Sequence, residues 1–157
     1  MRTLSVLITA IMLLGTATVQ ADPATEKAIH DLIMSGTAYV RENLKGEKGT
    51  ISKEGSTEFW SSGGLLHHVP ADADPQEFEV FTTRPKHITV VTLVPGQAAA
   101  AFYYSEGALK PKGGTEVSNY LTRVTEIYVK EDGEWKLRGA HWSPVTGGAG
   151  TSQTSVD

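Results

Sequence analysis

The chain has 157 residues, no cysteine and a formal net charge of −4, and 39% of its residues are hydrophobic. This length fits one domain and this composition supplies a core, so two full domains and wholesale disorder are excluded. The absence of a basic excess argues against nucleic-acid binding, and the absence of cysteine excludes disulfides, thiolate metal sites and cysteine nucleophiles.

The N-terminus is typical of a signal peptide. Arg2 precedes an apolar run from Leu4 to Val19, and Val19 and Ala21 occupy the −3 and −1 positions of a cleavage site. An uncleaved anchor is the less favoured interpretation, because the run is shorter than the roughly 20 residues that a membrane-spanning helix needs. We therefore expect a signal peptide over residues 1–21 and a secreted or periplasmic protein that no longer contacts the membrane after cleavage.

The C-terminus is also predicted to lie outside the fold. Residues 146–157 (TGGAGTSQTSVD) are glycines and small polar residues with almost nothing to bury, which is typical of a flexible tail. The folded domain is therefore expected over residues 22–145.

The first half of this domain is predicted to begin with one amphipathic helix. Hydrophobic residues recur at helical spacing over Pro23–Leu44, and Pro23 suits the first turn of a helix. A polar, glycine-containing stretch follows, and then a short hairpin is expected between Glu58 and Val69 around a Ser-Ser-Gly-Gly turn. Asp72–Phe81 opens with an acidic cap and a proline, which predicts a short second helix.

Strands dominate the second half. Residues 88–94 and 98–105 flank the turn Pro95-Gly96, and residues 119–129 and 135–143 flank Asp132-Gly133, a strong two-residue hairpin signal. A helix followed by antiparallel strands predicts an α+β fold, in which the helix packs on a curved sheet and encloses a pocket.

The Asp132-Gly133 turn also predicts which residues share a face of the last hairpin. With Glu131 opposite Glu134, Tyr128 opposes Leu137, Glu126 opposes Gly139 and Val124 opposes His141. The first face then includes Tyr120, Glu126, Tyr128, His141 and Ser143. The second face holds Arg123, Thr125, Ile127, Val129, Lys136, Arg138, Ala140 and Trp142.

The closing hairpin resembles that of the nuclear transport factor 2-like superfamily. The matching residues in Thr125–Ser143 are Thr125, Ile127, Tyr128, Asp132, Gly133, Trp135, Leu137, His141 and Ser143. Within that superfamily the segment resembles the association domain of calcium/calmodulin-dependent protein kinase II and the SnoaL-like secreted bacterial domains. Gly96, the alanine-rich strand to Glu106 and Gly113-Gly114 can be laid over the same domain.

This resemblance implies a cone-shaped fold of N-terminal helices on a curved antiparallel sheet, and a tendency to oligomerise. It does not imply kinase activity, since the chain has no room for a kinase domain and no Gly-rich loop. It places Glu126 and His141 on the concave face and Glu106 on the pocket wall. The superfamily positions that match Glu106 and Glu126 are basic, so a preference for acidic ligands does not carry over.

Glu106, Glu126 and His141 are therefore the candidate catalytic residues, expected in one shared cavity. Desolvation and mutual repulsion raise the pKa of paired carboxyls, which suits acid–base chemistry near neutral pH, and a histidine can relay a proton. A purely structural polar cluster is the alternative. The candidate ligand-binding residues around them are Tyr104, Tyr120, Tyr128, Ser143 and Trp60.

Metal and cofactor sites are not predicted. His67 and His68 are adjacent and point to opposite faces of a strand, so only one of them can reach the pocket, and the sequence does not say which. No metal-ligand spacing is present, and Gly63-Gly64 and Gly113-Gly114 are turns rather than phosphate loops. Ser143 lacks the context of a hydrolase nucleophile.

Two functions remain open. The favoured one is an exported small-molecule-binding or oligomerisation domain with a polar and apolar pocket. The alternative is a cofactor-independent pocket enzyme of the isomerase, cyclase or hydrolase type with a glutamate as general base.

A homodimer through the outer sheet face is also expected. Ile127, Val129, Ala140 and Trp142 would form an exposed apolar patch in a monomer, with Trp142 near the centre of the contact. Arg123, Lys136 and Arg138 lie on the same predicted face. In a dimer they would repel the same residues of the second chain unless acidic residues pair with them.

Overall fold

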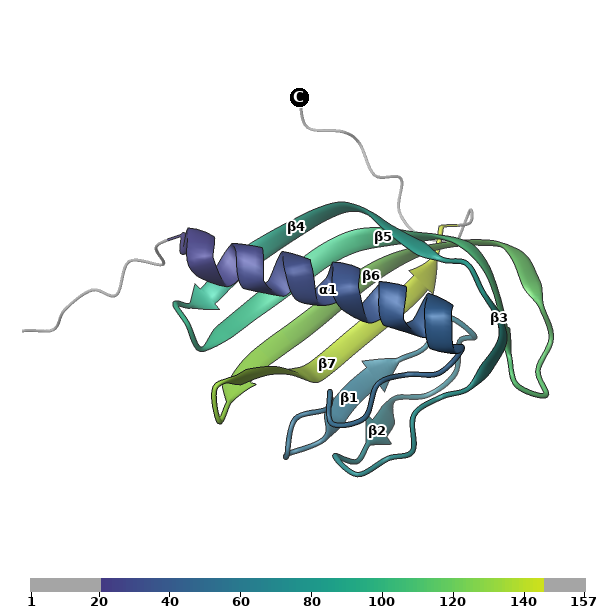
Figure 1. Ribbon diagram of the computed structural model, residues 1–157, viewed down its shortest axis with the longest axis horizontal. Helices are drawn as coiled ribbons and strands as arrows, with labels where there is room; N and C mark the ends of the chain where they lie inside the picture. Colours follow the sequence, from purple (N-terminus) through teal and green to yellow (C-terminus); the bar gives the residue numbers. More distant parts are fainter. Residues whose placement is uncertain (1–20, 146–157) are drawn as a thin grey trace, which may run out of the picture.

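The structure, a computed structural model, describes residues 21–145, and they form one helix packed on a strongly curled sheet (Figure 1). The predicted signal peptide and tail lie outside the described residues, apart from Ala21. Helix α1 spans Pro23–Asn43. The strands are β1 (Ser56–Phe59), β2 (His67–Val69), β3 (Phe78–Phe81), β4 (Arg84–Val94), β5 (Ala98–Pro111), β6 (Val117–Glu131) and β7 (Glu134–Pro144).

The predicted first helix is confirmed to within one residue. The Asp22 carboxylate accepts hydrogen bonds from the Ala24 backbone amide and the Thr25 hydroxyl, which caps the N-terminus of α1. Leu44 ends the helix in a left-handed conformation, with φ at 52°. Within residues 21–145 no helix is both long enough and apolar enough to cross a membrane.

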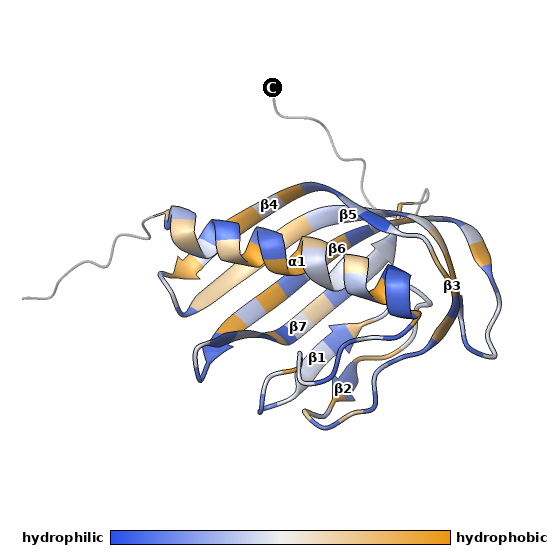
Figure 2. Cartoon of the chain, in the orientation of Figure 1, coloured by the Kyte–Doolittle hydropathy of each residue, from blue (hydrophilic) through white to orange (hydrophobic). Residues whose placement is uncertain are grey.

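The hydrophobic core lies between α1 and the first part of β5. Ile29 and Ile33 are buried against Ala99, Ala101 and Tyr128. The alanine side chains are short, so the helix can approach the sheet closely and its two isoleucines fill the space. Figure 2 shows the hydrophobic parts of β4 and β5 beside the N-terminal half of α1.

The sheet has seven strands, and both predicted C-terminal hairpins are confirmed. The order is β2-β1-β7-β6-β5-β3, and β4 also pairs with β5. The predicted short hairpin is present as β1 and β2. Strand β1 additionally pairs in parallel with β7, which adds the β1–β2 hairpin to the sheet and makes the sheet mixed rather than purely antiparallel.

The predicted helix over Asp72–Phe81 is wrong. Phe78–Phe81 forms β3 and pairs with the end of β5, and the residues before it run as a loop. The segment 72–77 carries almost no hydrophobic residues that a helix could bury, whereas the aromatic and β-branched residues of 78–81 favour a strand. The capping pattern at Asp72 therefore has no helix to cap.

The turn at Asp132-Gly133 forms as predicted, but the register beyond it changes. Glu131 opposes Glu134 and Tyr128 opposes Leu137, as expected from the two-residue turn. Ile127 then opposes Gly139, so Arg138 is an extra residue on β7, a β-bulge.

This bulge reverses the faces of β7 after Arg138. Glu126 now opposes Ala140 rather than Gly139, and Val124 opposes Trp142 rather than His141. Because side chains alternate along a strand, Ala140 and Trp142 share the concave face with Glu126, while His141 and Ser143 face outward.

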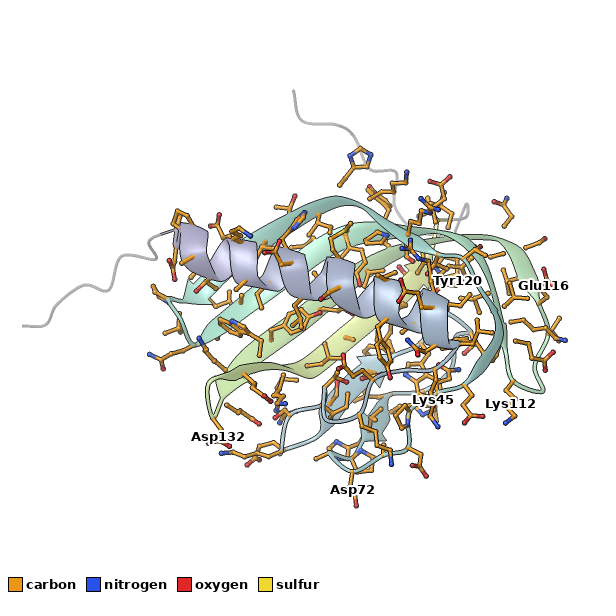
Figure 3. The ribbon with its side chains drawn as sticks, viewed as in Figure 1. Lys45, Asp72, Lys112, Glu116, Tyr120 and Asp132 are labelled. Atoms are coloured by element: carbon orange, nitrogen blue, oxygen red, sulfur yellow. The ribbon has the colours of Figure 1, made fainter. Side chains whose placement is uncertain are left out.

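Two ion pairs of Glu77 connect the segment after α1 to the turn after β5. Lys45 follows the helix and Lys112 lies in the turn after β5 (Figure 3). The Glu77 carboxylate accepts from the Lys45 ammonium at 3.0 Å and from the Lys112 ammonium at 2.5 Å. These two lysines lower the pKa of Glu77 to about 2, mainly through their hydrogen bonds.

We expect Glu77→Gln to lower stability at pH 7 and to have no effect near pH 2. The folded-state pKa of Glu77 lies below its unfolded value of 4.5, so its contribution is present above pH 4.5 and is lost as the pH falls toward 2. Urea unfolding at several pH values measures this difference, with the exposed Glu54→Gln as control. An effect that is equal at pH 2 and pH 7 would show that the ion pairs are not its source.

Candidate functional site

Two glutamates lie in one row across the concave face of the sheet. Glu58 on β1 pairs with Ala140 on β7, and Ala140 pairs with Glu126 on β6. Glu58 is 5% exposed and Glu126 is 8% exposed, so both are buried. Their Cα atoms are separated by two strand spacings, about 10 Å, and the short alanine between them leaves room for the two carboxyls to approach.

The Glu126 carboxyl is held by two tyrosines. The Tyr128 hydroxyl donates to its Oε2 at 2.7 Å, and Tyr103 on β5 hydrogen-bonds the same carboxyl. Tyr128 lies two residues along the same strand, whereas Tyr103 is two residues beyond Ala101, the partner of Glu126 on β5. The carboxyl is thus positioned by donors from two neighbouring strands.

Burial controls the titration of this group. Desolvation raises the pKa of Glu126 above its usual value of 4.5, the hydrogen bonds from Tyr128 and Tyr103 lower it, and the charge of Glu58 raises it. Burial together with the Glu126 charge raises the pKa of both tyrosines well above 10, so they remain neutral donors. A carboxyl with a raised pKa can exchange protons nearer neutral pH than an exposed one.

The Glu58 carboxylate connects this buried site to the surface. Its Oε2 accepts a hydrogen bond from the Trp60 indole at 2.8 Å. Trp60 is 42% exposed and its other neighbour is His67, whose ring stacks on it at 4.5 Å. Trp60 therefore touches both the buried carboxylate and solvent.

Trp60 also lines a cavity of about 370 Å³ at the end of β1. The cavity lies between the β1–β2 loop and the last residues of β7. Its lining residues are Phe59, Trp60, Ser61, Ser62, Gly63, Gly64, His141, Trp142, Ser143 and Pro144. The wall is rich in aromatic residues, and one of them, Trp60, donates the hydrogen bond to Glu58.

The structure does not bring the three predicted catalytic residues together. Glu126 is on the concave face as predicted, and its partner on β5 is Ala101. Because side chains alternate along the strand, the odd-numbered residues from Ala101 to Ser105 share that face, and Glu106 is exposed on the outer face. His141 is exposed on the outer face because of the bulge at Arg138, and its ring contacts Phe59. The predicted shared cavity of these three side chains is therefore wrong.

The predicted ligand-binding residues are divided in the same way. Tyr128 and Tyr120 share the face of Glu126, and the Tyr120 hydroxyl donates to Ser61 in the β1–β2 loop. Tyr104 and Ser143 face outward with Glu106 and His141. Ser143 and Trp60 line the cavity beside β7. Whether any of these residues contacts a ligand stays a prediction.

His67 and His68 are adjacent on β2, and only one of them lies on the side of the concave site. Both are exposed, and His67 lies opposite Glu58 and against Trp60. His68 lies instead against Gly55, where a Cβ atom would be 2.5 Å from its ring. His67 is therefore the histidine on the side of the concave site.

Sequence reasoning missed Glu58 and Tyr103. Glu58 reaches the site through the parallel pairing of β1 with β7, which no local pattern indicates. Tyr103 and Tyr104 are adjacent, so they point to opposite faces of β5. The connection between β5 and β6 is not a two-residue turn, so the sequence does not fix the register that would say which of them faces Glu126. The one available signal was an acidic residue inside a predicted strand, directly before two aromatic residues.

The donor set does not form a metal site. Among residues 21–145 no group of three or more histidine and carboxylate side chains is placed to hold a metal ion. Glu58 and Glu126 supply two carboxyls, and the other groups bonded to them are tyrosine hydroxyls and an indole, which are poor ligands when protonated.

The sequence matches no family model and no curated protein. In structure it is similar to an NTF2-like protein of unknown function from Pseudomonas putida KT2440, with a TM-score of 0.53, 20% identity, and coverage of 78% of this chain and 87% of that one. It is also similar to a protein with a cystatin-like fold from Caulobacter vibrioides, with a TM-score of 0.51, 15% identity, and coverage of 76% and 86%. The association domain of C. elegans CaMKII gives a TM-score of 0.46 and 15% identity, with coverage of 76% and 98%.

The chain thus has the NTF2-like fold, in which one helix packs on a strongly curled mixed sheet. This confirms the predicted α+β class and the resemblance at the level of the fold. At these identities the likeness carries no activity or ligand over to this chain, because one fold serves many functions.

Proposed function

We propose that this chain is a small-molecule-binding domain whose ligand contacts the Glu126 carboxyl on the concave face. The observation that carries the proposal is a buried carboxyl held by two tyrosines beside a second buried carboxyl, on the curved face of the fold. A protein gains no stability from two neighbouring buried carboxyls, since their desolvation opposes folding. Their presence is better explained by binding than by packing.

The cavity beside Trp60 supports a route to this site. Trp60 is half exposed, lines the cavity and donates to Glu58, so this one side chain lies between the cavity and the Glu58 carboxyl. Gly63 and Gly64 in the adjacent loop both have positive φ, and no atom lies within 4 Å of the place where a Cβ would stand on either, which leaves the loop free of side-chain bulk.

A fragment screen by NMR tests this proposal. We expect bound fragments to shift the backbone amides of Ala101, Tyr128 and Ala140, which surround Glu126. Glu126→Gln should weaken those fragments by about tenfold or more, since a hydrogen bond to a charged group contributes roughly 1.5–3 kcal/mol. Glu106→Gln, on the outer face, is the matched control and should leave binding unchanged.

The same screen separates binding from catalysis. The raised pKa of Glu126 favours acid–base chemistry as the second candidate function. Deuterium incorporation from solvent at a carbon of a bound fragment, lost in Glu126→Gln, would assign the site to an enzyme. If no fragment in a diverse screen shifts these amides, the binding proposal is wrong.

We also propose that the outer sheet face forms a homodimer. Ile127 is exposed there as predicted, but Ala140 and Trp142 are on the concave side, so the bulge moves the predicted centre of the contact. The exposed apolar residues on the outer face include Phe59, Val91, Phe102, Tyr104, Leu121 and Ile127. Patches of this kind usually mark an interaction site.

One of the three basic residues predicted on this face has an acidic partner. Lys136 forms an ion pair with Glu134, which compensates its charge. Arg138 donates to the Gly55 carbonyl, which fixes its position and leaves its charge. Arg123 remains on the outer face, and the exposed Glu106 in the next row of that face offers an opposite charge that a two-fold partner can present to it.

Export after cleavage at Ala21 is a further part of the proposal. Asp22 supplies the cap of α1 through its own side chain, so cleavage before it leaves the helix terminus intact. The mass of the protein recovered from the producing cell's exterior or periplasm measures this. A mass that includes residues 1–21 would contradict it.

A further inference from the structure

The two buried glutamates have no cationic partner among residues 21–145. The ion pairs of this part of the chain engage other acids, namely Asp31, Asp74, Glu77, Glu79 and Glu134. Glu58 is bonded to an indole and Glu126 to tyrosine hydroxyls, which are neutral donors. Buried carboxylates in proteins are normally paired, so this site lacks a positive charge.

A buried hydroxyl beside the glutamates also lacks a partner. Ser56 is fully buried two residues before Glu58 on the same face of β1, and its Oγ makes no hydrogen bond within the described part of the chain. Thr122 Oγ1, on the concave face of β6, is also buried and also makes no hydrogen bond within residues 21–145. Buried polar atoms nearly always have a partner, so an unpartnered hydroxyl beside two carboxyls points to a group that is bound there.

The set of acceptors matches one kind of ligand group. A primary ammonium has three N–H donors and no acceptor. Glu58 and Glu126 supply acceptors from one row of the concave face, through Ala140, and Ser56 supplies a third from the same face of β1, two residues before Glu58. A neutral or anionic ligand would leave the charge of the carboxyls uncompensated.

We propose that the concave site binds the ammonium group of a small organic amine, with Glu58 and Glu126 as its counter-charges and Ser56 as its third acceptor. This inference rests on the proposed binding function and adds the ligand's chemical class. The apolar part of the amine extends toward Trp60 and the aromatic cavity at the end of β1.

Three four-carbon probes test the charge directly in the unaltered protein. Butylammonium, 1-butanol and butyrate have the same chain length and differ in charge, and each is titrated while the amides of Ala101, Tyr128 and Ala140 are observed by NMR. We expect butylammonium to bind at least about tenfold more tightly than 1-butanol, and butyrate not to bind. A tenfold difference corresponds to about 1.4 kcal/mol.

Variants then assign the contacts. Glu58→Gln and Glu126→Gln should each weaken butylammonium by about tenfold or more and leave 1-butanol unchanged, since only the charge is removed. Ser56→Ala should weaken it a few-fold. Glu106→Gln is the control on the outer face, and its affinity should equal that of the unaltered protein.

The outcomes distinguish this inference from the proposed function. Equal affinity for 1-butanol, preference for butyrate, or fragment hits that are all neutral or anionic would overturn the amine and keep the binding site. Failure of every probe and every fragment to shift the concave amides would overturn both. The comparison of probes uses the unaltered chain, so the test stands even where a variant fails to fold.

Discussion

Phe102→Asp is expected to convert the proposed homodimer to a monomer. Phe102 is 45% exposed in the middle of the outer face, where its row across the sheet contains Thr89, Thr125, His141 and Phe59. In the next row of the same face, Ala100 pairs with Val91 on one side and with Ile127 on the other, so both lie close to Phe102. In a two-fold contact an aspartate at this position would be buried without a partner charge, at a cost of several kcal/mol.

Sedimentation at micromolar concentration measures this effect. The unaltered protein should sediment at twice the mass of one chain, and Phe102→Asp at the mass of one. Ile127→Asp, on the neighbouring strand, should act in the same way and guards against a local defect of one variant. Leu65→Asp, at an 85% exposed position in the β1–β2 loop, is the control and should remain dimeric.

An unaltered protein that sediments as a monomer would contradict the proposed homodimer. A dimer that survives both outer-face substitutions would place the interface elsewhere, with the free edge of β4 as the next surface to test, since β4 pairs on one side only.

Ile29→Ala should lower the free energy of unfolding by about 2–4 kcal/mol. Ile29 is 0% exposed and is the largest fully buried side chain among the described residues. Beneath it lie Ala99 and Ala101, which are too short to move into the space that the substitution leaves. The cavity therefore persists, and its cost adds to the lost hydrophobic transfer energy.

Urea unfolding at a fixed protein concentration measures this, because association would otherwise shift the apparent stability. Met34→Ala, at a 46% exposed position of the same helix, is the matched control and should change stability by less than about 0.5 kcal/mol. Equal effects of the two substitutions would mean that α1 does not present its Ile29 face to the sheet.

The amino-acid sequence by itself determined the elements whose signals are local. The spacing of hydrophobic residues after Asp22 predicted α1, and Asp132-Gly133 predicted the last turn and the first four residue pairs beyond it. These features depend on residues within a few positions of one another, where periodicity and turn chemistry act directly.

Only the tertiary structure decided which polar residues meet. One extra residue at Arg138 reverses the face of every later side chain on β7, so it moves His141 outward and Trp142 inward. The parallel pairing of β1 with β7 brings Glu58 into the row of Glu126, although the two are far apart in the sequence and no turn specifies their register. Glu126 could be predicted because its own strand was long and regular. Its partners could not, because alternation along a strand assigns a face only relative to a register that distant strands impose.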